Sequence, residues 1–132
     1  MLAVFTYLQE VRILIVKKGE VYYADLNSVI GCEQGGYRPV IIVQNNIGNF
    51  HSPTTIIVPV TARMRKKALP THIKVKGAGL PKKSIALLEQ LRTIDKSRLK
   101  EKIGEITRTS LNKIDKGLLI SLGCFEDRRD KK

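Results

Sequence analysis

The stretch Glu33-Gln34-Gly35-Gly36-Tyr37-Arg38-Pro39-Val40 joins a glycine-rich loop to an apolar strand. Its two adjacent glycines allow backbone angles that other residues resist. The fixed φ of Pro39 suits the rim of a sheet rather than its middle. The apolar run 40–43 that follows is typical of a buried strand. The stretch therefore predicts a strand that begins at the edge of a core, with Arg38 at the junction.

Arg38 has two interpretations when this stretch is taken alone. A cation that is held on a preformed turn is well placed to bind a phosphate. An arginine that only packs against a surface hairpin fits the same residues equally well. The rest of the chain has to decide between a binding role and a structural one.

Short strand-like runs lie on both sides of this stretch, separated by turn signals. The predicted strands are 20–26, 39–44, 54–61, 71–76, 84–94 and 103–106, with loops at 27–36, 45–53 and 63–70. Pro59 indicates that the third of these strands is an edge strand or contains a bulge. We treat 84–94 as one continuous strand, because its apolar run leads directly into Arg92-Thr93-Ile94.

The C-terminal pattern is helical instead. Leucine and isoleucine recur at helical spacing from Leu111 to Leu122. This predicts one helix of roughly 14 residues from about Ser110, with Thr107 or Thr109 as its cap. Many short strands and one late helix predict a mainly β domain, which is a small closed barrel or sheet with the helix packed on it.

Composition fits one small domain with an unusual charge. The chain has 132 residues, 42% of them hydrophobic and none of them tryptophan, so aliphatic side chains must fill its core. The formal net charge is +12, which favours a polyanionic partner such as nucleic acid. Eight basic residues and no acidic one lie between Ala62 and Lys83. This block predicts an anion-binding face, and a membrane surface is the weaker alternative.

Several classes of protein find no support in the sequence. Cys32 and Cys124 form no CxxC pair, so we expect two free thiols, a reducing cytoplasm and no metal site. Neither His51 nor His72 has a nearby partner in the sequence that suggests a proton relay, and we interpret both as surface or structural residues. Residues 1–16 are apolar but too short to span a bilayer and make a poor signal peptide. Motifs of P-loop proteins, serine hydrolases and HExxH zinc enzymes are absent.

The polar residues that remain are Glu33, Gln34, Arg38, Thr61 and the run Leu88 to Thr93. Glu, Gln, Arg and Thr side chains can read base edges and hold phosphates. A polar strand end without a ligand explains the run 88–93 equally simply when it is considered alone.

Five stretches together resemble the MazF/PemK toxins of toxin–antitoxin modules, also called EndoA or Kid-type endoribonucleases. They are KKGEVYYADL (17–26), GCEQGGYRPVIIVQNN (31–46), SPTTIIVPVTA (52–62), LPTHIKV (69–75) and LLEQLRTIDKSRLKEKIG (87–104). They match in type, order and spacing over about residues 17–125. The resemblance divides the chain into an N-terminal extension at 1–16, which is unusual for such toxins, a toxin domain at 17–125 and a charged tail at 126–132.

The resemblance implies an SH3-like antiparallel barrel with a C-terminal helix. It implies a cytoplasmic homodimer that cleaves single-stranded messenger RNA at short sequences without a metal or other cofactor, and a MazE-like antitoxin that occupies the RNA groove. Carried over position by position, Arg38 and Thr61 are the catalytic pair. The implied RNA contacts are Glu89, Gln90, Arg92 and Thr93, with Glu33 and Gln34 in the loop before Arg38. The basic loop with Arg65, Lys66 and Lys67 is expected to shape the groove.

Two other functions compete with the ribonuclease. The first is a barrel that binds RNA or DNA without cutting it, for which the basic block alone would suffice. The second is a toxin of the same fold that poisons gyrase, which would not require Arg38 and Thr61. The resemblance and this residue pair favour the ribonuclease, because fold analogy alone does not establish a function.

Overall fold

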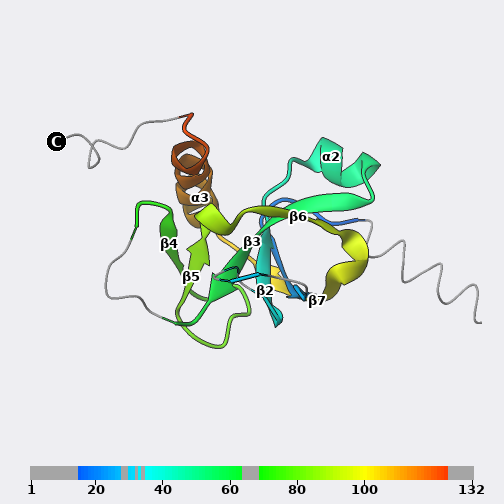
Figure 1. The fold of residues 1–132 in the computed structure, drawn as a ribbon, viewed down its shortest axis with the longest axis horizontal. Coiled ribbons are helices and arrows are strands. Elements are labelled where there is room, and N and C mark those ends of the chain that lie inside the picture. The colour runs from blue at the N-terminus through cyan, green and yellow to red at the C-terminus, as the bar shows by residue number, and fades with distance from the viewer. Residues whose placement is uncertain (1–14, 28–29, 32, 34, 64–68, 125–132) are drawn as a thin grey trace, which may run out of the picture.

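Seven strands form one bent antiparallel sheet in the computed structural model, which describes residues 15–27, 30–31, 33, 35–63 and 69–124 (Figure 1). The strands are β1 (Glu20–Asp25), β2 (Tyr37–Ile42), β3 (Thr54–Thr61), β4 (His72–Val75), β5 (Ser84–Leu87), β6 (Arg92–Asp95) and β7 (Leu99–Glu105). The helices are α2 (Asn46–His51), α3 (Arg108–Ser121) and the short 3₁₀ turns η1 (Leu88–Gln90) and η2 (Lys96–Arg98). The predicted segments 1–16 and 126–132 lie almost wholly outside the described residues.

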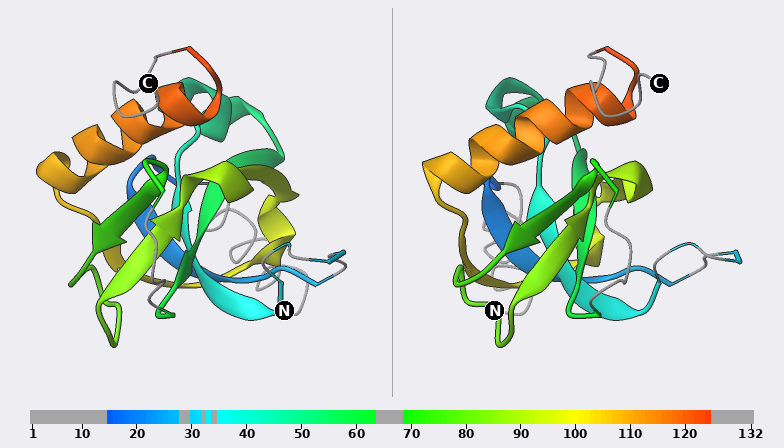
Figure 2. Two further views of the ribbon diagram at one scale, coloured as in Figure 1. Left: turned by 60° about the vertical axis from the view of Figure 1, so that its left-hand side comes forward. Right: turned by 90° about the vertical axis from the view of Figure 1, so that its left-hand side faces the viewer.

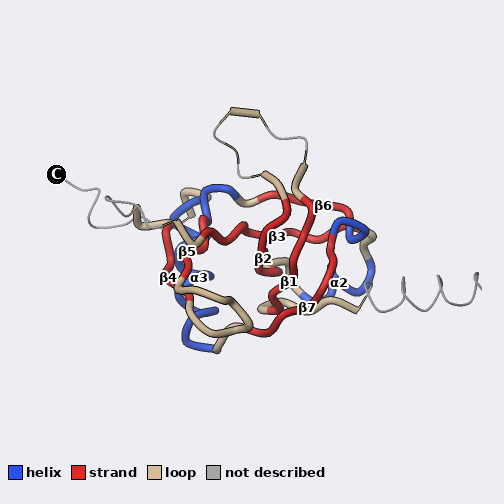
Figure 3. The backbone as a smooth tube through the Cα atoms, turned by 90° about the horizontal axis from the view of Figure 1, so that it is seen from below, coloured by secondary structure: helices blue, strands red, loops and turns tan. Residues whose placement is uncertain are grey.

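The strand order is β4-β5-β3-β2-β1-β7, and β6 pairs with β3 beside this path. The two end strands, β4 and β7, do not pair with each other in the described part of the chain, so the bent sheet stays open. Figure 3 shows α3 beside β4 and β5, with α2 at the opposite end of the sheet. The prediction of a mainly β domain with a C-terminal helix on the sheet is confirmed, in the form of an open barrel.

Alternating apolar residues give the sheet two buried faces. Val40 and Ile42 of β2 belong to one core cluster, whereas Ile41 between them belongs to the other. The second cluster includes Ile114 of α3, so the helix covers that face (Figure 2). Because both faces are buried, β2 reads as a continuous apolar run rather than as an alternating one.

Helix α3 has the predicted cap and packs on the sheet as predicted, but it begins two residues earlier than expected. The Oγ1 of Thr107 accepts a hydrogen bond from the backbone N–H of Ser110 at 3.1 Å, which is the expected N-cap. Gly117 is buried on the inner side of the helix. A Cβ placed there would lie 2.3 Å from the Cδ1 atom of Leu88, so only glycine lets α3 approach η1 this closely.

The expectation that Pro59 marks an edge or a bulge in β3 is wrong. β3 is an interior strand, and Pro59 faces Val40 of β2. On its other side, β3 pairs with β6 through residues 54–57 and with β5 through residues 60–61. Pro59 lies between these two pairings, where β3 changes partner, so its missing N–H disturbs neither ladder.

The predicted single strand 84–94 is also wrong. The chain forms β5, turns through η1, and returns to β3 as β6 at a different position. The backbone N–H of Leu91 donates to the carbonyl of Leu88 at 3.2 Å and closes the turn. Leu88 is fully buried in the core cluster that includes Ile114 of α3.

The predicted loop 45–53 contains helix α2. Asn45 caps it by accepting a hydrogen bond from the N–H of Gly48 at 2.8 Å. Asn49 is fully buried, and its side chain bonds to Gln44 and Thr55. Lys96, also buried, donates to the carbonyl of Asn49. These tertiary partners satisfy polar residues that read as a loop in the sequence.

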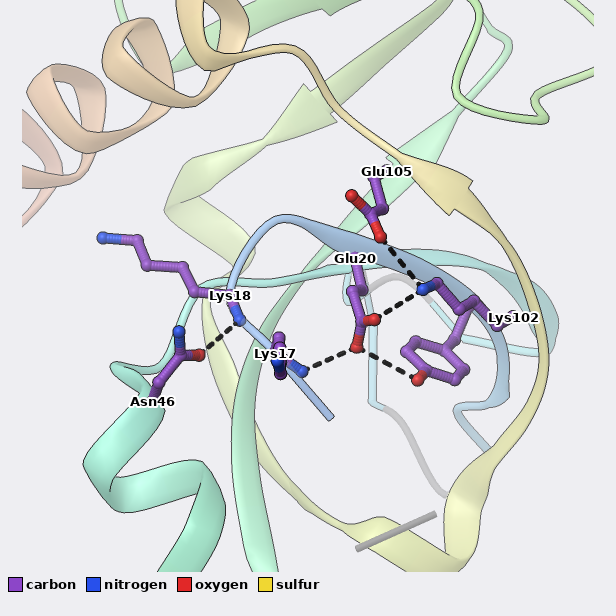
Figure 4. A network of polar contacts seen from close by, with 7 residues as sticks. Lys17, Lys18, Glu20, Asn46, Lys102 and Glu105 are labelled. Atoms are coloured by element: carbon purple, nitrogen blue, oxygen red, sulfur yellow. Dashed lines mark hydrogen bonds and ion pairs between the residues drawn. The ribbon is translucent and has the colours of Figure 1, made fainter. Parts of the chain in front are cut away.

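A second buried polar group joins β1 to β7 (Figure 4). Glu20 accepts hydrogen bonds from the N–H of Lys17 at 2.6 Å and the hydroxyl of Tyr22 at 3.2 Å, and pairs with the ammonium group of Lys102 at 2.6 Å. Burial and the neighbouring Glu20 raise the pKa of Tyr22 to about 12. Hydrogen bonds to Glu20 and Glu105 raise the pKa of Lys102.

Candidate functional site

A pocket of about 330 Å³ lies where the loop before β2 meets η1 and the start of β6. It is lined by Glu33, Glu89, Gln90, Leu91 and Arg92. Four of these five residues are predicted RNA contacts, and they come from segments more than 50 residues apart in the sequence. The pocket combines two carboxylates, an amide, a guanidinium and one apolar side chain.

Glu89 is held by two residues at the start of β4. The hydroxyl of Thr71 donates to its Oε1 at 3.1 Å, and the Nε2 of His72 lies 3.1 Å from its Oε2. The side chain of His72 is only 4% exposed, whereas that of Glu89 is 33% exposed. The carboxylate therefore sits on the pocket wall, with a buried imidazole behind it.

His72 therefore agrees with its interpretation as a surface or structural residue, since its ring is buried and has a partner. The backbone N–H of Leu69 points to its Nδ1 at 3.3 Å, so Nδ1 is the acceptor. The neutral tautomer with hydrogen on Nε2 then satisfies both contacts, donating to Glu89. In the register of β4 and β5, His72 lies opposite Leu87, two residues before Glu89. The contact between His72 and Glu89 depends on this register, which the sequence alone does not give.

Arg92 begins β6 and faces Ile57 of β3. Its Nη1 atom is buried and has no hydrogen-bond partner among the described residues. A buried guanidinium donor without a partner is costly, and a ligand in the pocket would satisfy it. Thr93 is exposed and, by strand alternation, points to the other side of β6. The structure therefore brings Arg92 to the pocket but does not bring Thr93 there.

Arg38 and Thr61 lie at matching positions on neighbouring strands. β2 and β3 pair antiparallel, and their ladder ends at Val40 opposite Pro59. Arg38 lies two residues before Val40, and Thr61 lies two residues after Pro59, so both come just beyond that end of the ladder. The two residues therefore lie at the same end of β2 and β3.

The loop before β2 orients Arg38. The Nε of Arg38 donates to the carbonyl of Gly35 at 2.7 Å, and Gly36 adopts a φ of 76°, which favours glycine. Arg38 itself is half-buried. The Oγ1 of Thr61 accepts a hydrogen bond from the N–H of Arg63 at 3.2 Å, which leaves its own hydroxyl hydrogen able to donate.

The described part of the basic block lies on β4 and in the segments next to β3, β4 and β5. It is exposed and comprises Arg63, Lys74, Lys76, Lys82 and Lys83. Lys74 lies two residues beyond His72 on β4, so both side chains point to the same side of that strand. Exposed cations without neighbouring carboxylates in the sequence suit a nucleic-acid partner.

The described residues carry few features of other kinds of site. These residues contain no group of three His, Cys, Asp or Glu side chains that could hold a metal ion. Cys124 is an exposed free thiol. No helix in the described ranges is long and apolar enough to cross a membrane.

Comparison with known families decides what this arrangement belongs to. Residues 17–122 match the family of PemK-like, MazF-like toxins of type II toxin–antitoxin systems. The chain belongs to this family. A related protein is the Endoribonuclease EndoA of Bacillus subtilis (strain 168), which is 49% identical over 115 residues, covering 86% of this chain and 99% of that protein.

Solved structures agree with this assignment of the MazF-like toxin. An endoribonuclease in complex with its cognate antitoxin, from a mycobacterial species, is 28% identical with a TM-score of 0.65, covering 83% of this chain and 94% of that one. MazF of Deinococcus radiodurans has a TM-score of 0.72 at 24% identity, covering 83% and 97%, and supports the fold.

The predicted site residues of this MazF-like toxin fall into three groups. Glu33, Glu89, Gln90 and Arg92 meet in the pocket, and Arg38 and Thr61 lie at the same end of β2 and β3. Gln34, Arg65, Lys66 and Lys67 lie outside the described residues, and Thr93 is on the far side of β6. Thr71 and His72 were missed, because their role depends on a contact between β4 and η1.

Proposed function

We propose that this MazF-like toxin is a metal-independent, sequence-specific endoribonuclease that cleaves single-stranded messenger RNA. The observation that carries the proposal is the polar pocket that brings Glu33, Glu89, Gln90 and Arg92 together, with Arg38 and Thr61 at the same end of β2 and β3. The 49% identity to a protein named an endoribonuclease supports the same activity. The exposed cations of the basic block supply attraction for the RNA backbone.

The reaction uses the nucleophile that RNA itself carries. The 2′-oxygen next to the scissile phosphate forms a bond to phosphorus while the bond from phosphorus to the 5′-oxygen breaks. The products are a 2′,3′-cyclic phosphate, or the 3′-phosphate after its hydrolysis, and a 5′-hydroxyl. The enzyme has to align the 2′-hydroxyl in line and stabilise the negative charge on the phosphorane oxygens.

Arg38 and Thr61 fit that electrostatic task. A guanidinium donates to phosphate oxygens from a fixed planar fork, and the hydrogen bond from Nε to Gly35 sets the direction of that plane. The Thr61 hydroxyl adds a neutral donor. With a pKa above about 12, arginine is a poor general base. Arg38 therefore acts by stabilising charge and by protonating the leaving 5′-oxygen, and Glu33 is the candidate base.

The partners follow from the family and its relatives. A type II toxin has a cognate protein antitoxin, and one similar endoribonuclease was solved in complex with its own. We propose a MazE-like antitoxin that covers the RNA groove, a homodimer as the active form, and the cytoplasm as the compartment where messenger RNA is met.

The first test is cleavage of a long single-stranded RNA in EDTA, with mapping of the cut ends. We expect discrete cuts at one recurring short sequence, and we expect Arg38→Ala to abolish them. Arg108→Ala removes the same charge from an exposed position at the start of α3 and serves as the matched control. It should cleave like the wild type.

Two results would contradict the proposal. Normal cleavage by Arg38→Ala would disprove the assigned mechanism. Intact RNA that the wild-type protein nevertheless retains would favour a non-catalytic nucleic-acid-binding barrel, and the gyrase alternative would then be tested by DNA supercoiling.

A further inference from the structure

Glu89 is the most constrained polar side chain of the pocket. Both of its oxygens accept hydrogen bonds from one direction, Oε1 from Thr71 and Oε2 from the imidazole of His72. Both donors are neutral in this arrangement, since Nδ1 of His72 is occupied by the N–H of Leu69. Glu89 therefore meets two uncharged donors in these contacts.

The backbone reinforces this arrangement. The N–H of Leu88 donates to the carbonyl of Thr71 at 3.0 Å, which ties η1 directly to the start of β4. Leu88 itself is locked beneath Gly117 of α3. The carboxylate thus has a fixed position and a fixed plane, which is the preorganisation that specific recognition needs.

A carboxylate held in this way has acceptor capacity left for a ligand. Each oxygen has two lone-pair directions, and the contacts with Thr71 and His72 use one on each oxygen. Glu89 also lines the pocket and is 33% exposed. The remaining lone pairs can therefore accept hydrogen bonds from a molecule in the pocket.

The chemistry of an acceptor-only group selects among nucleobases. Adenine, cytosine and guanine each present an exocyclic amino group, which is a donor that glutamate can bind. Uracil presents two carbonyl oxygens on either side of its single N–H. A fixed carboxylate would lie against at least one of those oxygens, and like-charged acceptors repel.

We infer that Glu89 reads the amino group of one unpaired base and rejects uracil there, and that His72 and Thr71 are positioning residues for this selection. The inference rests on the proposed ribonuclease function, because base selection is read out through cleavage. It assigns His72 a role in specificity that is separate from the catalytic pair Arg38 and Thr61.

The experiment compares cleavage of a randomised single-stranded RNA pool in EDTA by the wild-type protein and its variants, with base preference scored at every position around the cut. We expect the wild type to disfavour uracil by about tenfold or more at one position, the size of effect that a good pair of base contacts gives. Glu89→Gln should reduce that preference to about threefold or less and leave the other positions unchanged, because an amide offers a donor as well as an acceptor.

The positioning role is tested with paired variants. His72→Phe keeps a ring but removes the donor, and it should relax selection at the same single position. His72→Gln can present an amide N–H near the place of Nε2 and should restore the selection. Thr71→Val removes the other donor at nearly constant volume. Glu101→Gln, an exposed residue of β7, removes the same charge as Glu89→Gln and should change nothing.

Each outcome separates the inference from the function it rests on. Wild-type cleavage with no position that excludes uracil overturns the inference and leaves the ribonuclease intact. A uniform loss of rate in His72→Phe, with unchanged base preference and a normal melting temperature, overturns the positioning role. If His72→Phe fails to fold, Thr71→Val decides. Absence of any wild-type cleavage overturns the proposed function, and the inference with it.

Discussion

Glu20 and its partners illustrate, at the scale of single residues, how this protein tolerates a buried charge. The carboxylate meets a backbone N–H, a phenol and an ammonium group, so its lone pairs are well used. This arrangement constrains the protonation of Tyr22. Its hydroxyl must stay protonated to donate, and burial beside Glu20 raises its pKa to about 12.

This shift predicts a loss of stability in alkali. Below the ordinary tyrosine pKa of about 10, the contribution of the Tyr22 hydroxyl to folding stability is complete. This contribution is lost as pH rises from about 10 towards 12, because the unfolded chain releases the proton first. We expect Tyr22→Phe to reduce the fall in unfolding free energy over that range by about 1–3 kcal/mol. Urea denaturation at stepped pH values measures it.

Part of the fall in unfolding free energy at alkaline pH should persist in Tyr22→Phe. Lys102 also has a raised pKa and loses its charge at high pH, so it contributes its own share. Tyr37→Phe, at an exposed tyrosine, is the control and should leave the wild-type profile unchanged. Parallel wild-type and Tyr22→Phe profiles between pH 10 and 12 would rule out the assigned cause.

At the scale of elements, the packing of α3 on η1 connects the hydrophobic core to the pocket. The helix approaches so closely at Gly117 that an added Cβ would clash with Leu88, which immediately precedes Glu89. The 3₁₀ turn cannot shift without moving both Glu89 and Gln90. The helix therefore supports the pocket although no residue of α3 is among those that line it in the described part of the chain.

We expect Gly117→Ala to displace η1 and to lower the unfolding free energy. Overpacking costs about 1–3 kcal/mol, and the better helix propensity of alanine offsets about 1 kcal/mol of it. Thermal and urea unfolding measure the loss, and the RNA-pool assay should reveal relaxed base selection. Asn112→Ala, at an exposed position of α3, isolates the propensity term and should not destabilise the protein. Equal stability of Gly117→Ala and the wild type would mean that the helix and η1 are free to move apart.

At the scale of the whole molecule, the charge distribution governs how RNA is captured. The net charge is +12, and two-thirds of it lies in the block from Ala62 to Lys83. Its described residues are exposed, and Lys74 shares one side of β4 with His72. We therefore expect the basic block to attract the RNA backbone while the pocket reads bases.

Replacing Arg65, Lys66 and Lys67 together by alanine should weaken RNA binding and reduce its salt dependence. Each contact with a single-stranded backbone contributes about 0.7 to the slope of log K against log salt, so the magnitude of the slope should fall by about 2. Binding of a 2′-O-methyl RNA, which lacks the nucleophile, is measured across salt concentrations. Alanine at Lys100, Arg108 and Lys113 removes the same charge from other exposed positions. An unchanged slope in the first triple variant would mean that its loop faces away from the RNA.

The sequence by itself determined the features that depend on local patterns. The periodic leucines and the Thr107 cap specified α3, and the β-branched run specified β3 with the bounds Thr54–Thr61. The turn before Arg38 was readable because only glycine readily takes a φ of 76°. The polar residues that the predicted core did not use included most of the residues that line the pocket, because such side chains are free to face solvent or a ligand.

The tertiary structure alone decided what non-local contacts control. Asn49 is helical and buried because Gln44, Thr55 and Lys96 satisfy it, and the sequence cannot display those partners. The strand 84–94 breaks because α3 takes Leu88 into the core and β3 offers two separate stretches for pairing. The same break brings Glu89 into contact with His72. Local propensity cannot express a contact between β4 and η1, since it exists only after the sheet has brought them together.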